Sequence, residues 1–237
     1  MNPLQTTTAP LGLVAAFRWE VLPLLRGQKN IRRRDRGHIQ LLLHGRPAVL
    51  AIAGAGAENA LRATRELLRS VPVAGVISVG FAGGLQEALQ TGDLLLAEEV
   101  IEEGTGRRFV CQPGLLRIEG GSAGILLSAG AVVNSVEAKR VLGSRWGAVA
   151  VDMESAGVAQ AAAEWGVPFG ALKSITDDSR QSLAIDFQRC RSEDGGLSAW
   201  KILRESLVTP HGLRELWRLA GSSRRAAENL ALALHSA

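Results

Sequence analysis

Short apolar runs alternate with amphipathic stretches along most of the chain. Runs of about four to eight apolar residues are typical of strands buried on both faces. We expect such strands at 11–16, 39–43, 48–53, 73–79, 94–100, 125–127, 148–151 and 169–175. Apolar residues at helical spacing predict helices at 19–25, 58–69, 136–142 and 155–164. This alternation predicts an α/β fold, a three-layer sandwich around a mostly parallel mixed sheet.

The chain changes character after the last predicted strand. Residues 197–207 and 213–234 predict two helices, separated by T-P-H-G, each with an apolar stripe. We find no repeat and no linker. The sequence therefore predicts a flexible N-terminus at 1–10 and a single domain at 11–237, of which 197–237 is a helical C-terminal extension.

The apolar stripes of this extension have two interpretations. The favoured one is ordinary packing over the sheet. The alternative is peripheral membrane contact, with Arg214, Arg218, Arg224 and Arg225 on lipid headgroups and the stripe facing a lipid-linked nucleoside.

Composition narrows the class of protein. The 237 residues, 46% of them hydrophobic, indicate a soluble globular protein. Cys111 and Cys190 show no metal-ligand or disulfide spacing, which favours reduced cytosolic thiols. The first residues show no signal-peptide pattern, and no apolar run is long enough to span a bilayer. We therefore expect a cytoplasmic protein.

The chain carries a net charge of +4, with basic clusters at 29–36, 107–108 and 224–225. Such clusters can bind nucleic acid or anionic lipid. No nucleic-acid motif accompanies them, and aromatic residues make up only 4% of the chain, so stacking platforms for bases are scarce. We interpret the clusters as solvated loops and helix faces and predict no nucleic-acid partner.

Candidate chemistry stands at the ends of three predicted strands, in G-F-A-G-G at 80–84, D-M-E at 152–154 and T-D-D at 176–178. Ligands of open α/β sheets bind beyond the carboxyl ends of the strands. One predicted helix joins the last two segments, so their acids should emerge on the same edge. Taken alone, Asp152 and Glu154 could simply favour a helix N-terminus, and Asp177 and Asp178 could form a polar turn.

A dinucleotide-binding protein is a weaker alternative. Gly54-Ala55-Gly56, followed by Ala60, partly matches a dinucleotide-binding turn. The next predicted strand ends in Gly80-Phe81, without the acid that would bind a ribose diol.

Together, the segments resemble a known enzyme family. V-I-S-V-G-F-A-G-G-L, T-G-D-L-L-L, A-V-A-V-D-M-E-S-A and V-P-F-G-A-L-K-S-I-T-D-D resemble the purine nucleoside phosphorylase/uridine phosphorylase family. Within it, the chain is most similar to the methylthioadenosine/S-adenosylhomocysteine nucleosidases and the hopanoid-associated nucleoside phosphorylases. The resemblance covers about residues 11–178. With the hopanoid-associated group it continues through P-H-G-L-R-E-L-W-R-L-A.

The resemblance implies roles for the matching residues. Asp177 would protonate N7 of a departing purine, with Thr176 beside it, and Glu20 would activate water. Met153 would pack on the ribose and Glu154 would accept hydrogen bonds from its hydroxyls, so that 152–154, including Asp152, form a sugar clamp. The backbone near Ala82, Gly83 and Val133 would border the pocket.

These residue types suit the chemistry. Cleavage of the ribosyl–adenine bond develops negative charge on the base, and a protonated carboxylic acid offsets it. Asp177 must then keep a proton near neutral pH, which partial burial beside Asp178 is expected to promote.

Three positions near the expected nucleophile depart from the nucleosidase pattern. Phe81 stands where nucleosidases have serine, Lys173 where they have arginine, and Val132 where they have an aromatic that stacks on adenine. Phosphorylases bring arginines to phosphate, whereas I-S-V-G before the glycine segment has none. Arg18, Lys173 and backbone N–H groups remain as possible phosphate contacts.

We therefore expect cleavage of the N-glycosidic bond of an adenine-type, 5′-substituted nucleoside, with either water or phosphate as the nucleophile. No metal or organic cofactor is expected, and phosphate is a possible co-substrate. The resemblance also implies a homo-oligomer. A catalytically lapsed nucleoside-binding module is the alternative.

Overall fold

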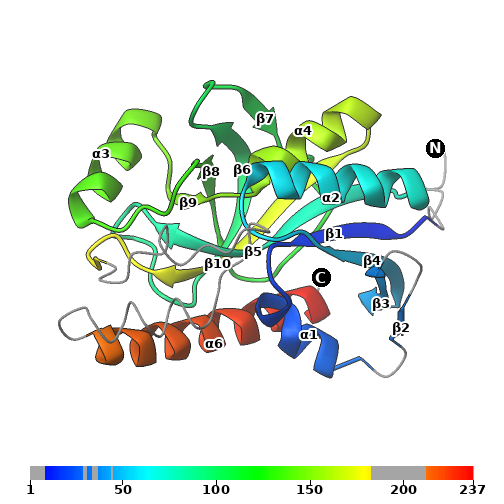
Figure 1. Cartoon of the computed structure of the whole chain (residues 1–237), viewed down its shortest axis with the longest axis horizontal. Helices are drawn as coiled ribbons and strands as arrows, with labels where there is room; N and C mark the ends of the chain where they lie inside the picture. The colour runs from blue at the N-terminus through cyan, green and yellow to red at the C-terminus, as the bar shows by residue number, and fades with distance from the viewer. Residues whose placement is uncertain (1–8, 29–30, 34–36, 44, 183–211, 237) are drawn as a thin grey trace.

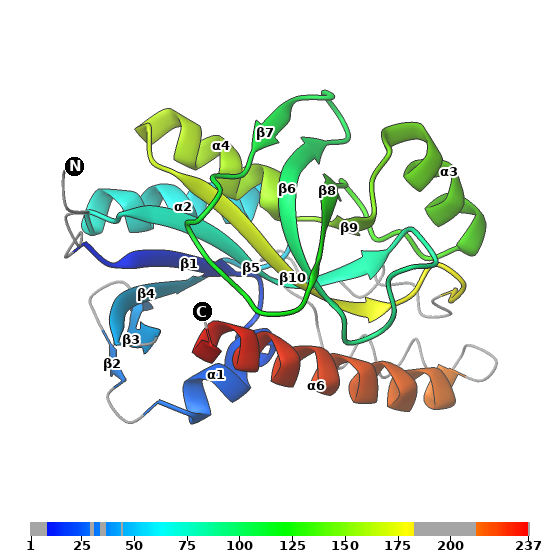
Figure 2. The same cartoon turned by 180° about the vertical axis from the view of Figure 1, so that it is seen from behind.

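A central mixed β-sheet organises the chain in the computed structural model, which describes residues 9–28, 31–33, 37–43, 45–182 and 212–236 (Figures 1 and 2). For residues 33, 212–217 and 236 the backbone alone is described. Within these residues the sheet has ten strands, and they are β1 (Leu11–Ala15), β2 (Arg32–Arg33), β3 (Ile39–Leu43), β4 (Arg46–Ile52), β5 (Gly75–Gly84), β6 (Leu94–Glu102), β7 (Arg108–Val110), β8 (Ser122–Ser128), β9 (Ala150–Asp152) and β10 (Phe169–Asp177).

The sheet is open at one end and closed at the other. Its order is β10-β6-β8-β9-β5-β1-β4-β3-β2, and β10 also pairs with β5, so five strands form a ring. β5 is the junction, because it pairs with β1 and β10 in parallel and with β9 antiparallel. The mixed sheet agrees with the predicted fold class.

The glycine segment corrects one expectation. We expected Gly80–Gly84 to be a turn beyond the strand, whereas β5 continues through it to Gly84. Both edges of β5 are occupied there, since Gly80 pairs with Lys173 of β10 and Gly83 pairs with Val151 of β9. Hydrogen bonding from two sides extends the strand beyond the point where side-chain pattern would end it.

Helices cover both faces of the sheet (Figures 1 and 2). On one face lie α2 (Ala57–Ser70) and α4 (Ser155–Trp165), with α3 (Val136–Trp146) beside the closed end. On the other lie η1 (Arg18–Val21), α1 (Leu22–Arg26) and α6 (Gly212–Ser236). α2 and α4 cross closely at Gly157, where a Cβ atom would lie 2.0 Å from the Ala57 carbonyl oxygen.

Every predicted strand and helix inside the described residues is present, with ends that shift by a few residues. β2 and β7 were not predicted, because two or three residues carry too little periodicity. The predicted helix at 197–207 lies outside the described residues, as do most of residues 1–10. The division into a flexible N-terminus and one domain therefore stays a prediction.

α6 decides between the two interpretations of its apolar stripe, as far as its described side chains reach. Ala227, Leu230, Ala231 and Leu234 are buried, and the last three belong to the core cluster on this face of the sheet. This half of the stripe packs on the protein and is not available to lipid. In the part of the chain that the structure describes, no helix is both long and apolar enough to cross a membrane.

Candidate active site

The carboxyl ends of β1, β5 and β10 bring the candidate residues to one edge of the sheet. These three strands are parallel neighbours, so Glu20 after β1, the glycines at the end of β5 and Asp177 at the end of β10 share that edge. Asp152 ends β9, one residue beyond the Val151–Gly83 pair. β9 runs antiparallel to β5, whereas β10 runs parallel to it, so the two acidic segments approach the end of β5 from opposite strand directions. That their acids share one binding site stays a prediction.

Glu20 is buried against β5. The residue is only 6% exposed, and its Oε2 accepts a hydrogen bond from the Phe17 backbone N–H at 2.9 Å. A Cβ atom at Gly80 would lie 3.1 Å from both carboxylate oxygens, so glycine is what admits the carboxylate. Burial and the nearby Glu154 carboxylate raise the pKa of Glu20 to about 7, against the N–H groups of Phe17 and Phe81 and the Lys173 ammonium.

Glu154 reaches across to the start of α2. Its Oε1 accepts a hydrogen bond from Gly56 N–H at 2.7 Å, at the N-terminus of that helix. Burial, with the Asp152 carboxylate second, raises the pKa of Glu154, while Lys173 and the Gly56 and Met153 N–H groups act in the opposite direction. Within the described residues the hydrogen bonds to this carboxylate come from backbone N–H groups, and no side chain donates to it.

This contact also weakens the dinucleotide alternative. The Gly56 N–H, which a pyrophosphate would need at the N-terminus of α2, is already bound by an internal carboxylate. A second anion there would face Glu154.

The sequence left two interpretations of D-M-E, a helix N-terminus and a sugar clamp, and the structure favours a different one for Asp152 than for Glu154. The Oδ2 of Asp152 accepts hydrogen bonds from the backbone N–H and the hydroxyl of Ser155, at 3.0 and 2.6 Å, in the first turn of α4. It also pairs with Lys173 Nζ at 2.9 Å. Asp152 therefore serves the helix end and the lysine, and Glu154, with partly buried Met153 beside it, is the member to which no described side chain donates a hydrogen bond.

Lys173 is the cation at the centre of this group. It is 2% exposed and donates to Ser78 Oγ at 3.0 Å as well as to Asp152. Burial lowers its pKa, but the carboxylates of Asp152, Glu154 and Glu20 together outweigh burial and raise it. We call Lys173, Asp152, Glu154 and Glu20 the Lys173 cluster. Arg18, which we expected near the nucleophile, is exposed in η1.

Asp177 lies on the other side of the β5 end. It is 5% exposed, its Oδ1 accepts a hydrogen bond from Thr176 Oγ1 at 2.8 Å, and a Cβ atom at Gly83 would lie 3.2 Å from its Oδ2. The same Oδ2 pairs with Lys139 Nζ of α3 at 2.5 Å.

Lys139 was missed by the sequence analysis, and it corrects the expected environment of Asp177. We expected a neighbouring acid, Asp178, to help Asp177 keep a proton. The Asp178 carboxylate instead accepts hydrogen bonds from Arg180 N–H and Gln181 Nε2. The charged group that contacts Asp177 is the Lys139 ammonium, not a second acid. The sequence held one signal for this contact, since Lys139 stands four residues before Gly143 and the two share one face of the helix. The structure buries both residues.

Of the remaining predicted positions, Phe81 and Ala82 lie in β5 between Gly80 and Gly83, and Val133 lies between β8 and α3. Ala82 is buried and its carbonyl oxygen is 3.4 Å from Thr176 Oγ1, Phe81 is partly buried, and Val133 packs on the core cluster that contains Val151. Glu20 adjoins Gly80 and Asp177 adjoins Gly83. Three residue steps along β5, from Gly80 to Gly83, span roughly 10 Å, so the two acids are separated by a distance compatible with a sugar joined to a purine.

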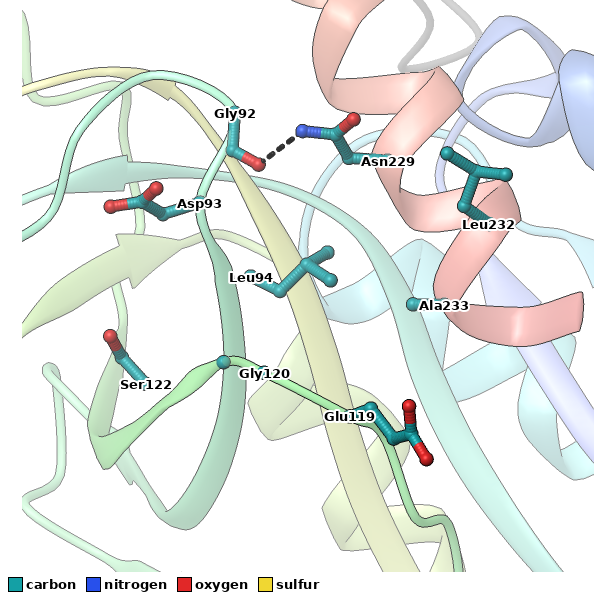
Figure 3. Close-up of a pocket in the computed structure, with 10 residues that line it drawn as sticks. Gly92, Asp93, Leu94, Glu119, Gly120, Ser122, Asn229, Leu232 and Ala233 are labelled. Carbon is teal, nitrogen blue, oxygen red and sulfur yellow. Dashed lines mark hydrogen bonds between the residues drawn. The ribbon is translucent and has the colours of Figure 1, made fainter. Parts of the chain in front are cut away.

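A separate cavity of about 560 Å³ lies where β6 begins, beside α6 (Figure 3). Asn229 Nδ2 donates to the Gly92 carbonyl oxygen at 2.7 Å at its rim. The cavity is lined by Gly92, Asp93, Leu94, Glu119, Gly120, Gly121, Ser122, Asn229, Leu232 and Ala233. None of the predicted site residues lines it. Among the described residues no group of His, Cys, Asp and Glu side chains has the arrangement of a metal site.

Comparisons with known proteins place this arrangement in context. The model of the phosphorylase superfamily matches residues 10–119 and 121–204. A 5′-methylthioadenosine/S-adenosylhomocysteine nucleosidase of Staphylococcus epidermidis is 24% identical over 206 aligned positions, covering 75% of this chain and 90% of that protein. An aminodeoxyfutalosine nucleosidase of Helicobacter pylori is 24% identical over 221 positions, covering 80% and 94%.

The solved structures agree on the fold. The crystal structure of the Neisseria meningitidis 5′-methylthioadenosine/S-adenosylhomocysteine nucleosidase in complex with methylthio-immucillin-A superposes with a TM-score of 0.69 at 20% identity. The match covers 97% of this chain and 100% of that one. The relatives compared here are nucleosidases, and the resemblance to the hopanoid-associated group stays a prediction.

Proposed function

Because this chain belongs to the phosphorylase superfamily, we propose that it is an enzyme that cleaves the N-glycosidic bond of an adenine-type nucleoside, with water as the nucleophile. The observation that carries the proposal is the buried Glu20 carboxylate in η1, which lies against Gly80 of β5 and whose pKa is raised to about 7. A general base works best when its pKa lies near the working pH. The two nucleosidase relatives support the reaction class.

Charge in the Lys173 cluster favours water over phosphate. The cluster sets three carboxylates against one ammonium, and Lys173 is already bound to Asp152 and Ser78. A phosphate dianion beside Glu20 and Glu154 would meet net negative charge. Arg18, the other expected phosphate contact, is exposed. A neutral water molecule meets no such repulsion and finds a base in Glu20.

We assign the roles as follows. Glu20 accepts the proton of the attacking water, Glu154 accepts hydrogen bonds from the ribose hydroxyls, and Met153 packs on the sugar. Asp177 binds the departing purine at N7, with Thr176 holding its Oδ1. Lys173 holds the neighbouring acids in place and takes no part in a chemical step.

The test is to incubate the purified protein with adenosine, methylthioadenosine and S-adenosylhomocysteine, with and without phosphate. We expect free adenine and an unphosphorylated sugar at a rate that does not depend on phosphate. A sugar phosphate formed only with phosphate present would make the enzyme a phosphorylase. Nucleoside binding without turnover would indicate the catalytically lapsed binding module.

Three finer predictions stay with this proposal, namely a bulky 5′ substituent, a homo-oligomer and a cytoplasmic location. The first follows from the resemblance to the hopanoid-associated group and is read out by ranking the 5′-substituted substrates. Sedimentation equilibrium measures the second. Peripheral membrane contact through the remaining part of the C-terminal extension also stays a prediction. Absence of co-sedimentation with anionic vesicles would exclude it.

A further inference from the structure

A buried lysine lies behind Asp177. Lys139 has no exposed surface, and its ammonium donates to Asp177 Oδ2 at 2.5 Å and to the carbonyl oxygens of Asp178 at 2.7 Å and Gln181 at 2.9 Å. An ammonium has three protons, so each one has an acceptor. Lys139 thus binds a carboxylate on one side and the turn that follows β10 on the other.

Asp177 has little freedom in this setting. Thr176 holds Oδ1 and Lys139 holds Oδ2, the oxygen that faces Gly83. A lone carboxylate would repel the negative charge that develops on a leaving purine. A carboxylate bonded to an ammonium is a neutral pair that also contains a transferable proton, one hydrogen bond behind the oxygen that faces the site.

We propose that Lys139 is a positioning residue of the leaving-group site, which acts through Asp177 by orienting its carboxylate and supplying the proton that the departing base takes up. This inference rests on the proposed function and deepens it.

The proton balance closes in one turnover. As the bond between C1′ and N9 breaks, its electron pair passes to the purine and N7 becomes basic. A proton moves from Lys139 Nζ to Asp177 and from Asp177 to N7, which leaves a neutral amine beside a carboxylate. The water oxygen bonds to C1′ and its proton passes to Glu20. Solvent then returns a proton to Lys139 and removes one from Glu20.

The leaving group separates this role from a structural one. Adenine must be protonated to depart, whereas para-nitrophenolate is stable as an anion and departs without a proton. We therefore compare kcat/KM for adenosine and for para-nitrophenyl riboside in Lys139→Met, which keeps the apolar stem and loses the charge, and in Lys139→Gln, which keeps one donor. The ratio of the two substrates does not depend on how much of a variant is folded.

For Lys139→Met we expect about a 100-fold loss with adenosine and less than about a threefold loss with the aryl riboside, since general acid catalysis contributes about two to four orders of magnitude. Asp177→Asn should show the same selectivity. The double variant should fall no further than Asp177→Asn alone, because the two residues act as one unit.

Arg140→Met is the matched control. Arg140 follows Lys139 in α3 but is exposed and pairs with Glu137, so this variant should leave both substrates unchanged. Equal losses of Lys139→Met on the two substrates, or no folded protein from either Lys139 variant, would make Lys139 a stability residue and overturn the inference. A wild-type protein that releases no adenine would overturn the proposed function instead, before any variant is made.

Discussion

The two buried lysines at this edge of the sheet have opposite surroundings. Lys139 faces one carboxylate and two carbonyl oxygens, whereas Lys173 faces the three carboxylates of Asp152, Glu154 and Glu20. One ammonium balances one carboxylate, but it cannot balance three. Burial first, and then the uncompensated neighbouring carboxylates, raise the pKa values of Glu20 and Glu154, and that of Glu20 reaches about 7.

This difference teaches how one sheet edge can carry two chemistries. Burial together with neighbouring carboxylates produces a group, Glu20, that takes up a proton near neutral pH, which suits the attack of water. A balanced acid–cation pair keeps a proton bonded beside a carboxylate, which suits a leaving base. Environments that push titratable groups apart in this way are the usual basis of acid and base roles.

The largest effect should follow from removing the proposed base. Glu20→Gln keeps the size of the side chain and its contact with Phe17 N–H, but it cannot take a proton. We expect kcat for adenine release to fall by about two to four orders of magnitude, with a smaller change in KM. Glu58→Gln, at an exposed acid of α2, is the control and should be unchanged. Wild-type rates in Glu20→Gln would remove Glu20 from the mechanism.

The next largest effect should follow from removing the cation of the Lys173 cluster. Lys173→Met leaves three carboxylates without their ammonium, and removing one partner of a buried ion pair destabilises a protein by about 3–5 kcal/mol. We expect urea unfolding to show this loss at pH 8 and a smaller one at pH 5, where carboxylates can take up protons. Arg65→Met, which breaks the surface pair with Glu164, should change stability little. Similar effects of the two variants would contradict the comparison.

The titration of Glu20 should appear in stability as well as in rate. Because its pKa rises from an ordinary 4.5 to about 7, the unfolded chain loses this proton first as pH increases. Stability must therefore fall between pH 4.5 and 7 and stay lower above it, by up to about 3 kcal/mol. Glu20→Gln should lack this fall, so its melting temperature should exceed that of the wild type more at pH 8 than at pH 5.

The rate should change in the opposite direction over the same interval. An ionised Glu20 is the active form, so kcat/KM should rise from pH 5 to 8 with a midpoint near 7. A rate that is flat across this interval would mean that Glu20 does not titrate as the base.

The smallest effect is expected at Thr176, the uncharged residue that contacts the Asp177–Lys139 pair. Thr176→Val removes the hydroxyl that donates to Asp177 Oδ1 at 2.8 Å and leaves Lys139 in place. One hydrogen bond to a charged group corresponds to about a tenfold loss in kcat with adenosine. Thr176→Ser keeps the hydroxyl and should retain most of the activity. A loss as large as that of Asp177→Asn would show that Lys139 does not hold the carboxylate by itself.

Much of the fold was open to prediction from single residues and their spacing. The buried runs at 39–43 and 94–100, and the helices at 58–69 and 155–164, appear in the structure within a few residues of the expected bounds. Local pattern is strong there, because burial on both strand faces or one helix face repeats at a fixed period. β7 escaped because three edge residues repeat nothing, and the extension of β5 through Gly84 depends on partners far away in the chain.

The sequence by itself determined that Glu154 and Asp177 follow the ends of two predicted strands, and the family resemblance added Glu20 to them. It did not determine what each acid meets there. The tertiary structure alone brought Lys139 of α3 to Asp177, Gly56 of α2 to Glu154 and Lys173 to three carboxylates at once. The end of a strand is marked locally by its apolar pattern, whereas the charge around a buried group is a sum over segments that only folding brings together.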